Sequence, residues 1–227
     1  MQVADRRGST KPVVQVALDV ASVEEAIALG EMAVGAGADW IEIGKPLMDF
    51  VGLRGLGAVT RCFEGTYILL DSMIMAGPGK YVDMAASLGV SNITVTALSP
   101  AATVSETIGL GKKAGLQVTV DLFNVRAPVE DCQMYEDMGA DYIMVHFGVD
   151  QKRRDPEGSP LMTLREVVSR VKIPVSYATY DLAESLSAVE CGASVIVQGE
   201  PILHAPDAAS ALKEFIEATK VAGRQVA

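Results

Sequence analysis

The sequence has little cysteine and an excess of acidic over basic residues. Its three cysteines (Cys62, Cys132 and Cys191) lack metal-ligand spacing, so we expect buried thiols in a reducing compartment. Lysine and arginine number 19 against 29 acidic residues, a net charge of −10, which argues against nucleic acid or an anionic membrane as partner. A small anionic substrate is not excluded, because a local pocket can differ from the global field.

Long apolar runs and interdomain linkers are also missing. No stretch approaches the length of a membrane span, and no Pro/Ser-rich segment divides the chain. Residues 1–10 are polar without the apolar run of a signal peptide, so we expect a disordered N-terminal tail and a cytoplasmic protein. We expect residues 11–227 to form one domain.

One short pattern occurs four times at intervals of 50 to 53 residues. Each copy begins with a glycine suited to the left-handed turn that ends a helix, and continues into an apolar, largely β-branched strand. The copies start at Gly37, Gly89, Gly139 and Gly192. Such fixed-period similarity indicates a repeated structural unit.

A second set of strands lies midway between these copies, at residues 13–19, 67–71, 117–121 and 174–178. Each period therefore holds two strands and two helices, and four periods give eight strands. Apolar strands that alternate with helices are typical of a parallel sheet, and this number in about 220 residues favours a single (β/α)8 TIM barrel. A doubly wound open sheet is the competing fold, but the fourfold regularity favours closure.

Polar side chains gather at the ends of these strands, where a barrel of this class carries its active face. They are Asp19, Glu42 with Lys45, Asp71, Asp121, His146 and Gln198. Carboxylates brought close together repel, and a divalent cation or a lysine removes that cost. Glu42 and Asp71 lie on adjacent strands, so we expect them to bind Mg²⁺. The alternative for Asp19 and Asp121 is that they cap the following loops.

His146 lies at the rim after four apolar residues, which favours a catalytic or substrate-binding role over simple packing. Lys45, between Gly44 and Pro46, is either a solvated lysine or an ammonium group in the pocket. The apolar loop at 72–79 is expected to pack against a ligand or another subunit. A long polar connection at 147–160 carries Arg153.

Several motifs resemble the 3-hexulose-6-phosphate synthase and 3-keto-L-gulonate-6-phosphate decarboxylase group of the orotidine 5′-monophosphate decarboxylase suprafamily. They are Ala17-Leu-Asp19, Ile41-Glu-Ile-Gly44, Val120-Asp-Leu122 and Val145-His-Phe-Gly-Val-Asp150. The resemblance covers residues 13–219. It implies a homodimeric barrel in which Mg²⁺ stabilises a cis-enediolate formed from a ketose phosphate.

The resemblance also assigns roles. Asp19 matches the substrate-contacting acid, Glu42 and Asp71 match the metal ligands, and His146 matches the proton-transfer histidine. Together with the strand-end pattern, this gives three sets of expected site residues. We expect Asp19, Lys45, Asp121 and His146 in catalysis; Asp19, Thr179, Gln198, Gly199 and Arg153 in substrate binding; and Glu42 and Asp71 in metal binding.

Two departures from the family pattern indicate changed chemistry. The Asp-x-Lys-x-x-Asp motif after the third strand reads Asp71-Ser-Met73-Ile-Met-Ala76, so methionine replaces the lysine that helps to stabilise the enediolate. The glycine-rich phosphate turns read Ala178-Thr179 and Gly199-Glu200, and Glu200 would repel a phosphate. Lys45 is a candidate replacement for the missing lysine.

Three functions follow from these observations. The first is a metal-assisted carbon–carbon lyase, an aldolase or decarboxylase, acting through an enediolate on a small keto-sugar or sugar-phosphate-like substrate. The second is an isomerase or epimerase that uses the same enediolate without cleaving the carbon chain. The third is a non-catalytic barrel that binds a ligand or a partner.

Overall fold

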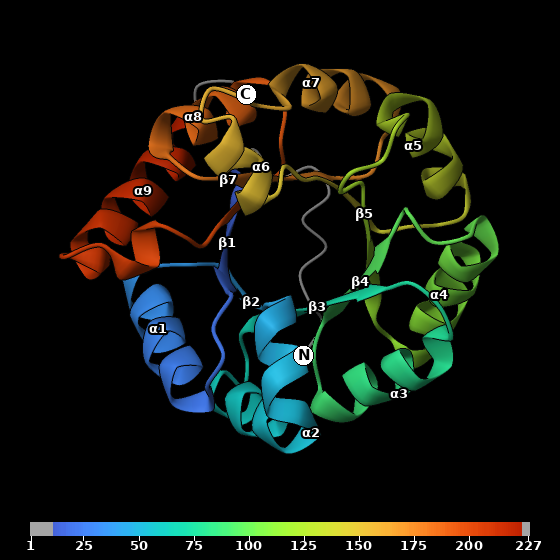
Figure 1. Ribbon diagram of the computed structural model, residues 1–227, viewed down its shortest axis with the longest axis horizontal. Helices are drawn as coiled ribbons and strands as arrows, with labels where there is room; N and C mark the ends of the chain where they lie inside the picture. Colours follow the sequence, from blue (N-terminus) through green and yellow to red (C-terminus); the bar gives the residue numbers. More distant parts are fainter. Residues whose placement is uncertain (1–10, 224–227) are drawn as a thin grey trace.

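The protein folds into a closed barrel of parallel strands surrounded by helices, in a computed structural model that describes residues 11–223 (Figure 1). The strands are β1 (Val13–Leu18), β2 (Trp40–Ile43), β3 (Tyr67–Ile74), β4 (Asn92–Thr96), β5 (Gln117–Asp121), β6 (Tyr142–Val145), β7 (Val175–Thr179) and β8 (Val195–Gln198). The helices are α1 (Val23–Ala36), α2 (Lys45–Cys62), α3 (Pro78–Leu88), α4 (Ala101–Ala114), α5 (Pro128–Asp137), α6 (Val149–Arg154), α7 (Leu161–Arg170), α8 (Leu182–Glu190), η1 (Ile202–His204) and α9 (Ala208–Ala222). The expected tail at residues 1–10 lies outside the described residues.

The strands pair in sequence order, and β8 returns to pair with β1. The ladder that closes the barrel aligns Val14 with Ile196 and Val16 with Gln198. This closure confirms the single (β/α)8 barrel and removes the free strand edges that an open sheet would leave. None of the described helices is both long enough and apolar enough to cross a membrane.

The four repeated glycines lie directly after helices, as their spacing predicts. Gly37, Gly89, Gly139 and Gly192 have φ values of 99°, 70°, 95° and 99°. A side chain with a Cβ is disfavoured in this left-handed region, whereas glycine enters it freely. The repeat therefore encodes the turn that reverses the chain from each of these helices into the next strand.

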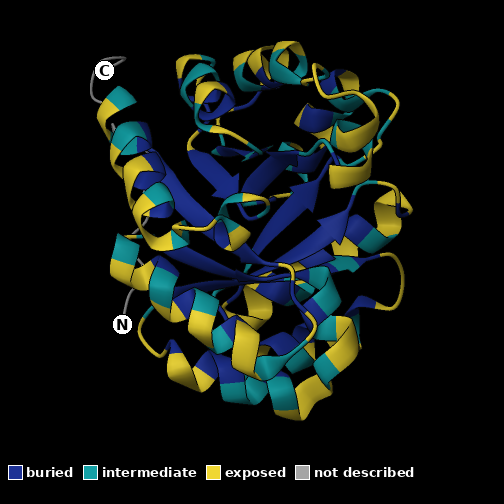
Figure 2. Ribbon diagram, turned by 60° about the vertical axis from the view of Figure 1, so that its left-hand side comes forward, coloured by how far each residue is buried: buried dark blue, intermediate teal, exposed yellow. Residues whose placement is uncertain are grey.

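Side chains alternate between the two faces of the barrel wall. Outward residues such as Val14, Val16 and Ile41 pack with the inner faces of the helices in the larger core cluster. Inward residues such as Trp40 and Tyr67 fill the bottom of the barrel, where their rings stack at 4.0 Å. Figure 2 shows this arrangement as buried strands enclosed by helices whose outer faces are exposed. The inward face also carries polar residues lower in the barrel, such as Asn92 and Gln117, which bond to Thr119 and Tyr67, respectively.

Three local features differ from the sequence expectations. Strand β3 continues past Asp71 to Ile74, with a register shift between Leu70 and Ile74 and a left-handed φ of 41° at Met73. Because Ser72 and Met73 bond to Thr94, their backbone joins the sheet instead of forming the expected loop. The connection at 147–160 contains the short helix α6, which Figure 1 shows in front of the barrel mouth.

Candidate active site

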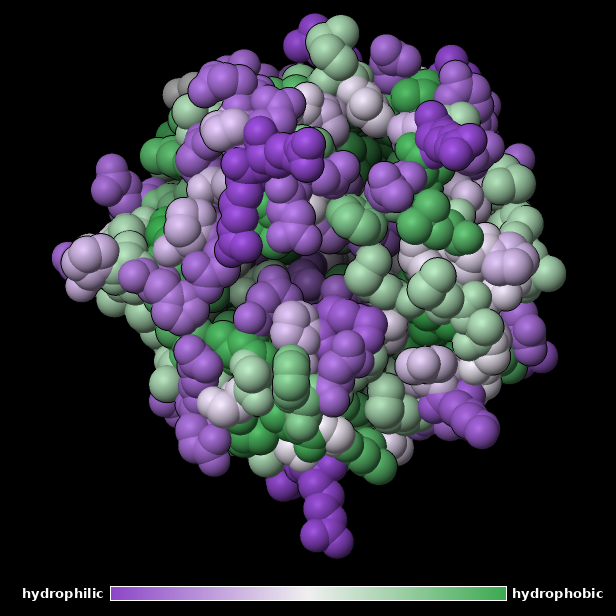
Figure 3. Space-filling model, in the orientation of Figure 1, coloured by the Kyte–Doolittle hydropathy of each residue, from purple (hydrophilic) through white to green (hydrophobic). Residues whose placement is uncertain are grey.

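A cavity of about 580 Å³ opens at the C-terminal ends of the strands. In the space-filling view along the barrel, hydrophilic side chains surround this central hollow (Figure 3). Most of the expected site residues line it: Asp19, Glu42, Lys45, Asp71, His146, Arg153, Thr179 and Gly199. They meet here because parallel strands bring their C-terminal ends to one rim.

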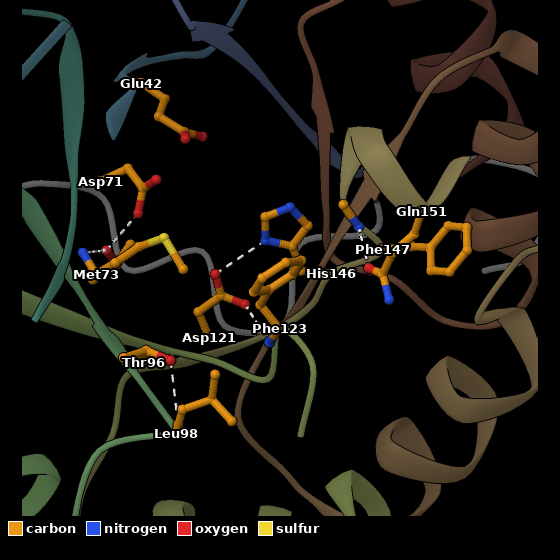
Figure 4. Close-up of polar contacts among 12 residues, drawn as sticks. Glu42, Asp71, Met73, Thr96, Leu98, Asp121, Phe123, His146, Phe147 and Gln151 are labelled. Carbon is orange, nitrogen blue, oxygen red and sulfur yellow. Dashed lines mark hydrogen bonds and ion pairs between the residues drawn. The ribbon is translucent and has the colours of Figure 1, made fainter. Parts of the chain in front are cut away.

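Glu42 on β2 and Asp71 on β3 occupy the floor of the cavity, where their carboxylates point into one common space (Figure 4). Glu42 is 6% exposed, and its Oε2 accepts a hydrogen bond from Gln15 Nε2. Asp71 Oδ1 accepts one from Thr94 Oγ1 at 2.6 Å. Burial, together with the neighbouring acids, raises the pKa of Glu42 well above its ordinary value and that of Asp71 to about 7.

Asp121 at the end of β5 and His146 after β6 form a hydrogen-bonded pair. His146 Nδ1 lies 3.0 Å from Asp121 Oδ2, and Asp121 Oδ1 accepts a hydrogen bond from the backbone N–H of Phe123 at 2.8 Å (Figure 4). The Phe123 ring packs against the imidazole with centroids 4.9 Å apart. Burial lowers the pKa of His146, but Asp121 and the more distant Asp71 and Asp19 raise it, and the net pKa is raised.

Asp19 follows β1 and lines the cavity. A Cβ on Gly44 would lie 2.1 Å from Asp19 Oδ1, so a glycine at position 44 makes room for this carboxylate. Partial desolvation and the neighbouring Glu200 raise the pKa of Asp19, and His146 opposes that shift. Asp19 therefore sits in a field of both signs, suited to accepting hydrogen bonds from a hydroxyl-bearing ligand.

Lys45 lines the cavity from the first turn of α2, but its ammonium group is engaged. Nζ bonds to both carboxylate oxygens of Asp49, at 2.5 Å and 2.7 Å, in an i,i+4 pair. No hydrogen bond within the described chain links Lys45 to Glu42 or Asp71. The replacement of the missing lysine by Lys45 therefore stays a prediction that requires this ion pair to open.

Arg153 and Gln198, which the sequence predicts to contact the substrate, have other neighbours in the structure. Arg153 lies on α6 with its side chain 75% exposed and 3.9 Å from Asp150. Gln198 does not line this cavity, because Val195 and Val197 take the inward positions of β8 and turn Gln198 outward, toward a second cavity beside α9. The expected contact of Gln198 with substrate is therefore corrected: its Nε2 bonds to the carbonyls of Gly199 and Glu200.

Sequence reasoning missed the residues that orient the acids. Gln15 and Thr94 hold Glu42 and Asp71, and Tyr180 lines the cavity while its hydroxyl donates to the carbonyl of Phe147 at 2.7 Å. A usable signal exists for the first two. Each is a polar residue within an otherwise apolar strand. Each lies an even number of residues before the polar residue at the end of its strand, so the two side chains point to the same face of the sheet.

The residues at the floor fit a hard divalent cation. Glu42 Oε1 and Asp71 Oδ2 make no hydrogen bond to other described residues, and burial together with the neighbouring acids raises the pKa of both carboxyl groups. No group of three or more His, Cys, Asp or Glu side chains within residues 11–223 could hold a metal ion. Two carboxylates with the remaining positions left to water or substrate match the way Mg²⁺ is commonly bound.

The fold and the cavity together define an α/β-barrel enzyme with an acidic site at its C-terminal mouth. Within that class the chain belongs to the orotidine 5′-phosphate decarboxylase / HUMPS family, whose model matches residues 12–215. This match confirms the family resemblance inferred from the strand-end motifs.

Relatives within the family cover nearly the whole chain. A 3-hexulose-6-phosphate synthase of Mycobacterium gastri is 28% identical over 88% of this chain and 96% of its own length. The 3-hexulose-6-phosphate synthase 3 of Staphylococcus saprophyticus is 30% identical over 89% of this chain and 98% of its own. The crystal structure of 3-hexulose-6-phosphate synthase from Salmonella typhimurium superposes with a TM-score of 0.83 at 26% identity, covering 91% of this chain and 98% of that one.

Proposed function

We propose that this protein is a metal-assisted carbon–carbon lyase, an aldolase or decarboxylase, that acts on a small keto-sugar through an enediolate. The observation that carries the proposal is the pair of carboxylates, Glu42 and Asp71, beside the Asp121–His146 pair in one cavity. The named activity of the synthase relatives supports the same reaction class.

Glu42 and Asp71 would hold Mg²⁺, and the cation would polarise the substrate carbonyl as a Lewis acid. Gln15 and Thr94 fix the two carboxylates through one oxygen each, which leaves the other oxygen directed at the cavity. Asp19 accepts hydrogen bonds from the hydroxyl groups of the substrate and thereby orients its carbon chain.

His146 moves the proton. With Nδ1 donating to Asp121, Nε2 is left to act on the substrate as a base, and Asp121 stabilises the imidazolium that results. In the aldol direction Nε2 removes the proton next to the carbonyl, and the electron pair of that C–H bond enters the enediolate. In the decarboxylation direction the imidazolium returns a proton to the enediolate carbon after CO₂ leaves.

Glu42→Gln tests the proposal, because it keeps the shape of the side chain and removes its charge. We expect turnover of a ketose substrate to fall by 10² or more and the thermal stabilisation by Mg²⁺ to disappear. Glu31→Gln, on the exposed face of α1, is the matched control and should change neither. Unchanged turnover in Glu42→Gln, with no Mg²⁺ binding by the wild type, would refute the metal-assisted mechanism.

The Asp121–His146 pair also favours a second candidate, isomerisation or epimerisation of a related ketose, because the imidazole can return the proton it removed. Turnover in deuterated water separates the two. An isomerase places deuterium on carbon in an intact product, whereas a lyase yields fragments. A barrel that only binds a ligand or partner would give neither result.

We further propose that the protein acts in the cytoplasm as a homodimer. Support for a second copy comes from large apolar side chains exposed beside the mouth, among them Phe50 at 74% and Met75 at 61%.

A further inference from the structure

We propose that the end of the cavity formed by the loops after β7 and β8 binds the hydroxyl- or ammonium-bearing end of an unphosphorylated substrate, and disfavours a phosphate ester. The inference rests on the proposed function for the chemistry at the Glu42–Asp71 end. It concerns which ligands the opposite end of the same cavity accepts.

Barrels of this class frequently bind phosphate at this position. The site usually combines backbone N–H groups from the loops after strands 7 and 8 with the N-terminus of a short helix. Such a cradle needs donors that are not already used, and it gains from nearby positive charge. Both requirements can be checked against the side chains and backbone of these two loops.

The loop after β7 uses its side-chain hydroxyl donors. Thr179 Oγ1 donates to the carbonyl of Asp181 at 3.1 Å, and the Tyr180 hydroxyl donates to the carbonyl of Phe147. The N-terminus of α8 is closed by the chain itself, because Asp181 Oδ1 accepts a hydrogen bond from the backbone N–H of Glu184 at 2.8 Å. A carboxylate thus already occupies the place where an anion would meet this helix.

The loop after β8 adds a carboxylate to the cavity, and two of its backbone N–H groups are already used. Pro201 has no N–H, and the N–H groups of Leu203 and His204 bond back to the carbonyls of Gly199 and Pro201. Glu200 lines the cavity directly. A Cβ on Gly199 would lie 3.0 Å from the carbonyl oxygen of Ala17, so a glycine at position 199 allows this loop to pack close against β1 and places Glu200 near Asp19.

His204 does not make the net charge at this end of the cavity positive. Its Nδ1 bonds to Glu200 Oε1, and its Nε2 lies 3.4 Å from Glu25 Oε1. Even a fully protonated imidazole would share one positive charge between two carboxylates. The group of Glu25, Glu200 and His204 therefore stays negative whether the imidazole is protonated or neutral.

The other charged groups around the cavity also disfavour an anionic ligand. Acids line it from several elements: Asp19, Glu42, Asp71, Asp150 and Glu200. The cations that line it already face carboxylates, since Lys45 pairs with Asp49, Arg153 lies near Asp150 and His146 bonds to Asp121. A phosphate dianion would enter a negative potential, whereas hydroxyl or ammonium groups would find acceptors at Glu200 and Asp19.

A matched series of three ligands tests the inference by calorimetric titration of the full-length protein in the presence of Mg²⁺. Each is a four-carbon aldonohydroxamate, a stable planar mimic of an enediolate, whose far end carries a hydroxyl, an ammonium or a phosphate group. We expect the hydroxyl or the ammonium compound to bind at least tenfold more tightly than the phosphate compound. The comparison of these first two ligands distinguishes a neutral polyol end from a cationic one.

Glu200→Gln supplies the second measurement. It should tighten binding of the phosphate compound several-fold and weaken that of the ammonium compound, while the control Glu166→Gln on the exposed face of α7 leaves all three affinities unchanged. Tightest binding of the phosphate compound to the wild type would overturn the inference and leave the proposed function intact. Failure of all three ligands to bind would overturn the proposed function together with the inference.

Discussion

Asp71 and Glu42 are carboxylic acids at the floor of the cavity, and ionising either side chain costs free energy in the folded protein. The pKa of Asp71 rises from 3.8 to about 7, first because of burial and then because of nearby acids. A group that ionises less readily when folded makes folding less favourable once the unfolded chain has ionised. Ionisation of the pair therefore lowers the stability of the metal-free protein, and the cation of the proposed function would offset that cost.

Asp71→Asn is expected to stabilise the metal-free protein at pH 8, on the order of 1–3 kcal/mol. Below pH 3.8 the carboxyl is protonated in both states and costs nothing. Between pH 3.8 and about 7 the unfolded chain releases its proton first, so the wild type loses stability as the pH rises. Denaturant unfolding of both proteins from pH 4 to 8 measures the effect, and the exposed Asp83→Asn should show no such trend.

Asp121→Asn is expected to lower the pKa of His146, because the hydrogen-bonded carboxylate is the strongest influence that raises it. The sequence contains two histidines, so a His204→Gln background leaves one imidazole to follow by NMR titration. For a reaction in which His146 acts as the base, the acid limb of the activity profile should move to lower pH in parallel. Asp137→Asn, exposed at the end of α5, is the control, and an equal pKa in all three proteins would contradict the pairing.

At the scale of elements, the repeat was the most readable part of the sequence. The glycine spacing and the strand-end acids predicted the eight strands and most of the site, because a closed parallel barrel leaves one place for both. The direction in which individual side chains point was harder to infer. Gln198 follows an apolar strand as His146 does, yet the residue phase of β8 turns it outward. The extension of β3 and the short α6 depend on tertiary contacts with Thr94 and Tyr180 that no local pattern encodes.

The repeated turns give a prediction with a matched pair. Gly192→Ala should destabilise the protein by about 1–3 kcal/mol, because its φ is 99° and a Cβ there would lie 2.8 Å from Val168 Cγ1. Gly109→Ala, inside α4 with open space at the Cβ position, should stabilise it by about 0.5–1 kcal/mol. Thermal unfolding of the two variants checks the opposite signs.

At the scale of the whole molecule, the mouth of the barrel is flanked by apolar surface on three consecutive βα units. Phe50 and Leu53 come from α2, Met75 follows β3 and Leu98 follows β4, and each is at least 48% exposed. Because all four follow the C-terminal ends of neighbouring strands, they lie on one side of the same rim. Clustered apolar residues of this kind are typical of a protein–protein interface.

Phe50→Glu combined with Leu53→Glu is therefore expected to convert a dimer into monomers, as measured by sedimentation velocity. A charge buried in the interface would cost several kcal/mol of association free energy. Met162→Glu, equally apolar and 67% exposed but on α7, is the control that should leave the dimer intact. A wild-type protein that sediments as a monomer at all concentrations would contradict the assembly.

The negative charge around the mouth affects how ligands enter and leave the cavity. Five carboxylates line the cavity from its Glu42–Asp71 floor to its mouth, and in their ionised forms they attract cations and repel anions. A product that gains negative charge in the cavity is therefore repelled as it forms. Departure of an acidic product should then be fast in dilute buffer and slow as dissolved salt shields the rim, while capture of a positively charged reactant weakens under the same conditions. The negative charge at the mouth would thus favour entry of cationic reactants and release of anionic products.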